Sequence, residues 1–173
     1  MAAWRSCQAV FISDSLEGHR KMIDILVYLF ENYLPDACPE PGALARKLSA
    51  AGFEQDEISE ALDWLAGLDR SDAVLLQLRP QSDALRVYDE EEHARLPIEC
   101  RGFLTFLEQA GTLDPELREI VVERALALPD REISLSKLKA IVLVVLWRRQ
   151  HEFDALILEE LLSEDDEADR LCH

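Results

Sequence analysis

The segment PGALARKLSAAGFEQDEISEALDWLAGL (residues 41–68) has the pattern of two helices joined by a tight turn. Pro41 suits a first helical position, where its missing N–H costs nothing, and leucines then recur four residues apart on one face. Gly52 suits the left-handed residue that ends a helix. A second apolar stripe occupies residues 58–68. The pattern therefore predicts a helix–turn–helix.

Two short strands are predicted directly after these helices, in VLLQLRPQSDALRVY (residues 74–88). Apolar and polar residues alternate on both sides of Pro80–Asp83, a cluster typical of turns. An amphipathic helix is also predicted at residues 22–33, before the helix–turn–helix. Three helices followed by a hairpin indicate a winged-helix-like unit, which we place at residues 22–96.

The second half of the chain is predicted to be a helical bundle at residues 97–163. Prolines separate its apolar periodic segments, as expected at helix ends. Residues 141–147 are apolar on every side, which is typical of a central helix. An acidic tail follows at residues 164–173. The predicted fold class is mainly α, with a winged-helix-like N-terminal part that contains a small β-hairpin, followed by a helical C-terminal bundle.

Residues 1–21 lack the periodicity of the rest and are predicted to be a non-native or disordered leader. They are too poor in basic residues for a transit peptide and have no apolar core of signal-peptide length. The helical pattern begins abruptly at Met22. Codons for Leu16-Glu17-Gly18 can contain GGAGG, a purine-rich run at the position of a bacterial ribosome-binding site. We therefore expect Met22 to be the natural start.

The composition is strongly acidic, with 35 Asp and Glu against 18 Lys and Arg and a net charge of −17. Phosphate backbones and anionic membranes repel such a chain, so the charge disfavours nucleic acid as a partner. No run approaches the ~20 apolar residues of a membrane helix, and no membrane association is expected. Four scattered cysteines without a CxxC spacing indicate free thiols in a reducing cytoplasm.

Acidic side chains lie opposite the apolar stripe of the second predicted helix, with no Lys or Arg among them. The candidate partner-binding residues are Asp56, Glu57, Glu60, Asp63 and Trp64. A helix–turn–helix normally inserts its second helix into the major groove, where these carboxylates would oppose phosphates. The face instead indicates a protein partner with a basic surface, although solubility alone also explains acidity. Trp64 is either an anchor of that contact or a packing residue at the core edge.

Nucleic-acid binding by the hairpin is the alternative hypothesis. The outward face of the predicted hairpin carries Arg79 and Arg86 beside Tyr88, and Arg46 and Lys47 add positive charge on the preceding helix. Interleaved basic and aromatic side chains are typical of such sites. A simply solvated face is the competing interpretation.

No catalytic residue, cofactor or metal ligand is predicted. The chain has neither a Gly-rich phosphate-binding motif nor an HExxH motif. His93 and His151 have no second ligand at helical spacing. Cys100 could imitate a thiol–imidazole pair with His93, but Pro97 breaks any helix between them and nothing orients the base. An enzyme with an unrecognised site is the weakest of the three hypotheses.

Four segments resemble the bacterial Smg family: MIDILVYLFE at residues 22–31, AGF at 51–53, ALDWL at 61–65 and RGFLTFLE at 101–108. The resemblance extends from about Met22 to the C-terminus, and the family's proteins begin at that position. It implies a small cytoplasmic proteobacterial protein. The family's genes often lie beside those for a DNA-processing protein of natural transformation and for translation and transfer-RNA modification factors.

The Smg family has no established activity, so the resemblance assigns no catalytic residue. We therefore expect a non-enzymatic protein-interaction module, an adaptor or regulator in a DNA-processing or translation-related pathway. Its partner is an unknown protein with a basic surface.

Overall fold

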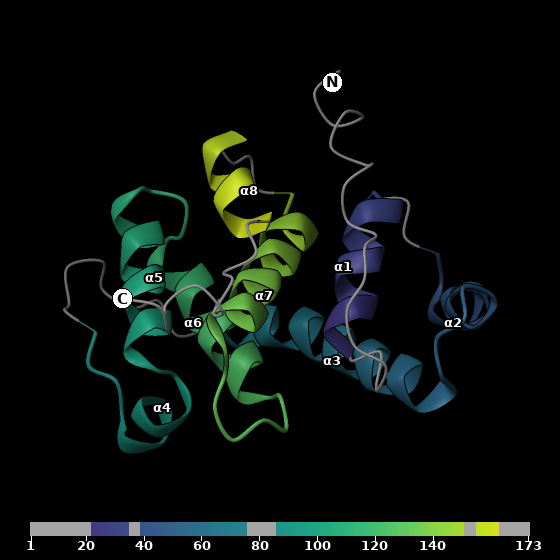
Figure 1. Cartoon of the computed structure of the whole chain (residues 1–173), viewed down its shortest axis with the longest axis horizontal. Coiled ribbons are helices and arrows are strands. Elements are labelled where there is room, and N and C mark those ends of the chain that lie inside the picture. Colours follow the sequence, from purple (N-terminus) through teal and green to yellow (C-terminus); the bar gives the residue numbers. More distant parts are fainter. Residues whose placement is uncertain (1–21, 35–38, 76–85, 151–154, 163–173) are drawn as a thin grey trace, which may run out of the picture.

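The computed structural model describes residues 22–34, 39–75, 86–150 and 155–162, and the regular structure within these ranges is helical (Figure 1). The helices are α1 (Met22–Asn32), α2 (Pro41–Ala50), α3 (Gln55–Leu75), α4 (Glu90–Arg95), α5 (Ile98–Gln109), α6 (Pro115–Leu126), α7 (Leu135–Arg148) and α8 (Ala155–Leu162). Their buried apolar side chains form one cluster, to which each described helix except α4 contributes.

Helix α7 is the centre of this cluster. Every residue from Leu138 to Trp147 is buried, because α1, α6 and α8 pack against the helix and α5 also contacts it. The indole N–H of Trp147 donates to the backbone carbonyl of Tyr33 at 3.2 Å, which ties the end of α7 to the end of α1. The prediction of a central, fully covered helix in the second half is confirmed.

The tight turn between α2 and α3 forms as the sequence predicts. Pro41 begins α2, and Gly52 has a φ of 97° directly after it. The backbone N–H of Gly52 donates to Ser49 and that of Phe53 donates to Leu48. This pair of hydrogen bonds is the Schellman motif, which a left-handed glycine permits.

The predicted winged-helix hairpin is wrong, and the fold is mainly helical. Helix α3 continues to Leu75, through residues assigned to the first strand, and residues 86–89 form no regular structure. No strand occurs anywhere in the described ranges. Short apolar runs do not distinguish strand from helix, and extending an existing helix costs less than forming a two-stranded hairpin. Residues 76–85, which include the predicted turn and Arg79, lie outside the described residues.

The division at residue 97 into two units stays a prediction. Helices from both sides of it share the core, since α3 packs on α6 and α1 packs on α7. The predicted leader and acidic tail lie outside the described residues. Within the described ranges, no helix has the length and apolar content needed to cross a membrane.

Candidate protein-interaction surface

Three carboxylates form an acidic face on the first half of α3. Asp56, Glu60 and Asp63 are exposed and follow one another at the i, i+4, i+7 spacing that places side chains on one side of a helix. Among the described residues, none of these carboxylates forms an ion pair or hydrogen bond. We call these three residues the α3 acidic face.

Glu57 does not belong to this face, although it was predicted there from the sequence. Its side chain is half-buried, and its carboxylate accepts a hydrogen bond from the backbone N–H of Glu54 at 3.3 Å. An acidic side chain that reaches back to the first free N–H groups stabilises the start of a helix. Glu57 therefore serves the N-terminus of α3.

Trp64 is a packing residue, because only 5% of it is exposed. Its indole N–H donates to the backbone carbonyl of Arg124 on α6 at 3.0 Å. The Arg124 guanidinium donates in return to the backbone carbonyl of Trp64 at 3.4 Å. These two hydrogen bonds clamp α3 to α6. Trp64 therefore packs at the core edge and is too buried to anchor a partner.

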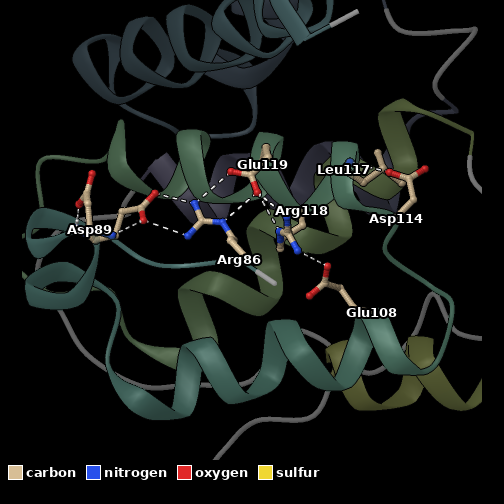
Figure 2. A network of polar contacts seen from close by, with 8 residues as sticks. Arg86, Asp89, Glu108, Asp114, Leu117, Arg118 and Glu119 are labelled. Carbon is tan, nitrogen blue, oxygen red and sulfur yellow. Dashed lines mark hydrogen bonds and ion pairs between the residues drawn. The ribbon is translucent and has the colours of Figure 1, made fainter. Parts of the chain in front are cut away.

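Arg86 lies in a cluster of ion pairs and not on an open basic surface (Figure 2). Its guanidinium donates to both oxygens of Glu92, at 2.9 and 2.6 Å, and to both oxygens of Glu119, at 2.8 and 3.0 Å. It also stacks over the ring of Tyr88, 4.2 Å from the centroid. Only 13% of the Arg86 side chain is exposed, so both edges of the guanidinium are occupied.

The cluster continues from Glu119 into α5. Arg118 donates to Glu119 at 2.7 Å and to Glu108 at 2.5 Å, as the dashed lines in Figure 2 show. Five side chains thus alternate in charge and join α4, α5 and α6 to the segment before α4. We call them the Arg86 network: Arg86, Glu92, Glu108, Arg118 and Glu119.

Interactions within the Arg86 network stabilise the charged forms of Arg86, Glu92 and Glu119. The hydrogen bond from Arg86 lowers the pKa of Glu92. Burial by itself would raise the pKa of Glu119, but the hydrogen bonds from Arg86 and Arg118 outweigh burial and lower it. Burial likewise opposes the charge of Arg86, yet its bonds to the two carboxylates raise its pKa. Buried charges are tolerated when they are paired and hydrogen-bonded in this way.

The sequence did not reveal the Arg86 network, because its members are far apart in the chain. Only one local signal was present. Asp89 and Glu92 have the spacing of a capping box, and the structure forms it, with each side chain accepting the other residue's backbone N–H. Glu92 thus caps α4 and pairs with Arg86 at once.

The predicted basic residues do not gather into one nucleic-acid-binding surface within the described chain. Arg46 is exposed and its side chain donates to Gly42 in its own helix. Lys47 is exposed, with its Nζ 5.3 Å from the Tyr33 ring centroid. Figure 1 places their helix, α2, at the opposite end of the molecule from α4, next to which Arg86 lies. Arg79 is outside the described residues.

His93 and Cys100, considered above as a thiol–imidazole pair, contact other groups in the structure. The Cys100 thiol donates to the backbone carbonyl of Ile133 at 3.3 Å, and burial raises the pKa of Cys100 to about 11. Such a thiol is not an activated nucleophile. His93 is exposed and lies beside the Tyr88 ring. Across the described residues, no group of three His, Cys, Asp or Glu side chains could hold a metal ion.

A family model described as "Protein of unknown function (DUF494)" matches residues 22–172. A "Protein Smg homolog" of Aromatoleum aromaticum is 56% identical over 152 residues, which cover 87% of this chain and 97% of the relative. One from Azoarcus sp. is 57% identical over 148 residues, with 84% and 96% covered. One from Bordetella pertussis is 51% identical over 154 residues, with 88% and 100% covered.

No solved structure matches the chain. The family match spans most of the chain, and the relatives are about half identical to it over nearly their whole length. The chain therefore belongs to the bacterial Smg family, whose shared domain is the one described as DUF494.

Proposed function

We propose that this protein is a non-enzymatic, cytoplasmic protein-interaction module, and that the α3 acidic face binds a basic surface on its partner. The observation that carries the proposal is the absence, in the described chain, of any cation paired with Asp56, Glu60 or Asp63. The carboxylates of the Arg86 network are already neutralised by neighbours. Those of the α3 acidic face keep their charge for an external partner.

The α3 acidic face is held on a rigid support, which favours specific binding. Helix α3 packs on α1, α2 and α6, and the Trp64–Arg124 clamp fixes it to α6. Binding groups on rigid elements lose little conformational freedom on association. Exposed charge of one sign also speeds association with a basic partner and disfavours acidic ones, and salt weakens the effect.

The pathway is a further part of this proposal. The neighbouring genes of the Smg family associate it with DNA processing and translation, so an adaptor or regulator in one of these processes is the function we infer. The partner would then be a basic protein, as many proteins that bind nucleic acid are.

The test compares two sets of three charge reversals with the same change in net charge. Asp56→Lys, Glu60→Lys and Asp63→Lys alter the α3 acidic face. Glu90→Lys, Glu132→Lys and Glu159→Lys alter exposed residues elsewhere. The tagged full chain and both variants are used to capture proteins from cells of the bacterium that encodes it. A captured protein is then purified, and its affinity is measured at low and physiological salt.

We expect a basic protein whose dissociation constant rises at least tenfold with the α3 reversals and less than threefold with the control reversals. Equal losses for both variants would show that only net charge matters. Retention of duplex DNA or RNA by the unchanged chain at physiological salt, in place of a protein, would contradict the proposal.

A further inference from the structure

The connection between α7 and α8 differs in sequence from the other connections between the described helices. Each of the others contains a proline or a glycine, the residues that typically end helices: Pro35, Gly52, Pro80, Pro97, Gly111 and Pro129. Residues 149–154 contain neither. The sequence from Leu135 to Leu162 is therefore compatible with one continuous helix.

The end of α7 depends instead on the backbone of Gln150. Its φ is 51°, and among the described residues it is the one non-glycine residue with a positive φ. Its backbone N–H donates to the carbonyl of Trp147 at 3.0 Å, as expected of a left-handed residue that follows a helix. Glycine adopts this conformation readily, but the Cβ of glutamine makes it costly. A helical Gln150 would relieve this strain.

Helix α8, the last described helix, folds back along α7. Glu160, near the end of α8, accepts a hydrogen bond from Nζ of Lys139 at 3.0 Å, and Lys139 lies in the second turn of α7. Leu161 is buried, and α8 packs on α7 (Figure 1). Apolar burial and an ion pair therefore hold α8 in its place.

The surface of α7 that α8 covers requires an occupant with a carboxylate. Only 1% of Lys139 is exposed, and its Nζ lies 5.6 Å from the centroid of the Phe103 ring on α5. A buried ammonium group is tolerated when a carboxylate and a ring replace its water. Any occupant in place of α8 must therefore bring a carboxylate beside an apolar stripe. A second copy of the chain brings both, in its own α8.

The two members of this ion pair lie at almost equal distances along the chain from Gln150. Lys139 is 11 residues before it and Glu160 is ten residues after it. When α7 continues through Gln150, α8 points away from the surface that it covers. Two such chains, related by a twofold axis near Gln150, each place Glu160 beside the Lys139 of the other copy.

We propose that α8 exchanges between two copies of the chain, with Gln150 as the hinge, and that the exchanged form is a dimer. The contacts of α8 in the dimer are those of the monomer. The balance between the two forms therefore depends on the hinge strain, the entropy of association and the charge of the copies.

Charge opposes the dimer, because each copy carries −17 and the two copies repel one another. The hinge itself adds no repulsion, since residues 148–154 contain two arginines and two acidic residues. Salt should therefore favour the dimer, because it screens the repulsion between the copies.

This inference goes beyond the α3 acidic face and does not depend on it. Helix α3 packs on α1, α2 and α6, whereas α8 packs on α7, so the exchange leaves the acidic face unchanged. The dimer would present that face twice, which strengthens binding to a partner with two basic sites. Failure of partner capture and failure of dimer formation are separate results.

The experiment uses the full chain. Unlabelled chains and chains labelled with heavy nitrogen are unfolded in urea, mixed and refolded together at about 1 mM, and size-exclusion chromatography separates monomer from dimer. A carbodiimide then joins Lys139 to Glu160 directly, and mass spectrometry identifies the label on each half of the crosslink. We expect single-label crosslinks in the monomer and crosslinks that combine the two labels in the dimer.

Two hinge variants should move the balance in opposite directions. Gln150→Gly favours the left-handed conformation and should lower the association constant of the dimer at least tenfold. Gln150→Ala favours the helix and should raise the constant at least threefold. Gln109→Gly and Gln109→Ala, at an exposed glutamine at the end of α5, should change it less than twofold. Raising salt from about 50 mM to about 500 mM should increase it in every chain.

Several outcomes would overturn the inference. The first is the absence of a dimer from both the unchanged chain and Gln150→Ala at about 1 mM protein. The second is a dimer in which the Lys139–Glu160 crosslinks never combine the two labels, since its copies would then meet through another surface. The third is an equal effect of Gln150→Gly and Gln150→Ala, with circular dichroism showing that both variants are folded.

Discussion

The α3 acidic face and the Arg86 network contain the same number of carboxylates and use them differently. In the Arg86 network, Glu92, Glu108 and Glu119 each accept a bond from a guanidinium. On α3, Asp56, Glu60 and Asp63 are exposed, and no cation of the described chain pairs with them. The first set holds four chain segments together, and the second set is the one that we propose for partner binding.

The difference shows that the acidic residues behind the net charge of −17 do not all have the same role in this fold. A partly buried charge is stable only when a fixed partner replaces the water that it loses. A fully hydrated charge has little effect on folding but interacts with any charged molecule that approaches. Exposure and pairing therefore separate the acids that stabilise the structure from the acids that we propose as partner-binding.

Arg86→Ala should have the largest effect on stability. It leaves Glu92 and Glu119 partly buried without their shared cation, and removing one member of a buried pair costs about 3–5 kcal/mol. Because these side chains retain some exposure, we expect a loss of about 3 kcal/mol in urea-induced unfolding. Arg46→Ala, an exposed control on α2, should cost less than about 0.5 kcal/mol. Similar losses for both would erase the distinction between the two regions.

The second prediction uses pH to separate the two sets of acids. Glu92 and Glu119 have lowered pKa values in the folded state, so the stability that they contribute is complete above their unfolded pKa of about 4.3. That stability is lost as pH falls through the folded pKa values. The double variant Glu92→Gln with Glu119→Gln should lose about 2 kcal/mol at pH 7. Urea midpoints measured from pH 7 to pH 3 should show this difference shrinking below pH 4.

A difference between the wild type and this double variant that stays constant down to pH 3 would argue against charged pairs. A difference near zero at every pH would mean that Arg86 stabilises the fold by packing on Tyr88 and not through the carboxylates.

The smallest effect on stability is expected from the α3 reversals. Asp56→Lys, Glu60→Lys and Asp63→Lys change exposed side chains, and surface substitutions usually alter the free energy of unfolding by less than about 0.5 kcal/mol each. Asp56 lies in the first turn of α3, where a positive charge opposes the helix dipole, so this member should account for most of any loss. Circular dichroism and urea unfolding of the single variants would measure each contribution.

The helices were predictable because their signals are local. Gly52 and Pro41 marked the ends of α2, and the fully apolar run in α7 marked its central position. The hairpin prediction was wrong because residues 74 and 75 lie in a short apolar run, which fits a strand and a helix equally well. Helix α3 was already formed on their N-terminal side, and its extension included them.

The candidate surface was predictable only in part. The spacing of Asp56, Glu60 and Asp63 placed them together, as the structure does. The burial of Trp64 depends on α6, about 60 residues further along the chain, and the pairing of Arg86 depends on Glu119, more than 30 residues away. Contacts of this kind leave no local pattern. The family model matches the chain, but its description gives no function from which these contacts could be inferred.

One matched measurement tests the distinction between the two regions most directly. Asp56→Asn, Glu60→Gln and Asp63→Asn form one triple variant, and Glu92→Gln, Glu108→Gln and Glu119→Gln form the other, so both remove three negative charges. Urea unfolding at pH 7 and low salt gives the free energy of each. We expect the α3 variant to stay within about 1 kcal/mol of the unchanged chain and the network variant to lose at least about 3 kcal/mol. Equal changes in the two would contradict the account.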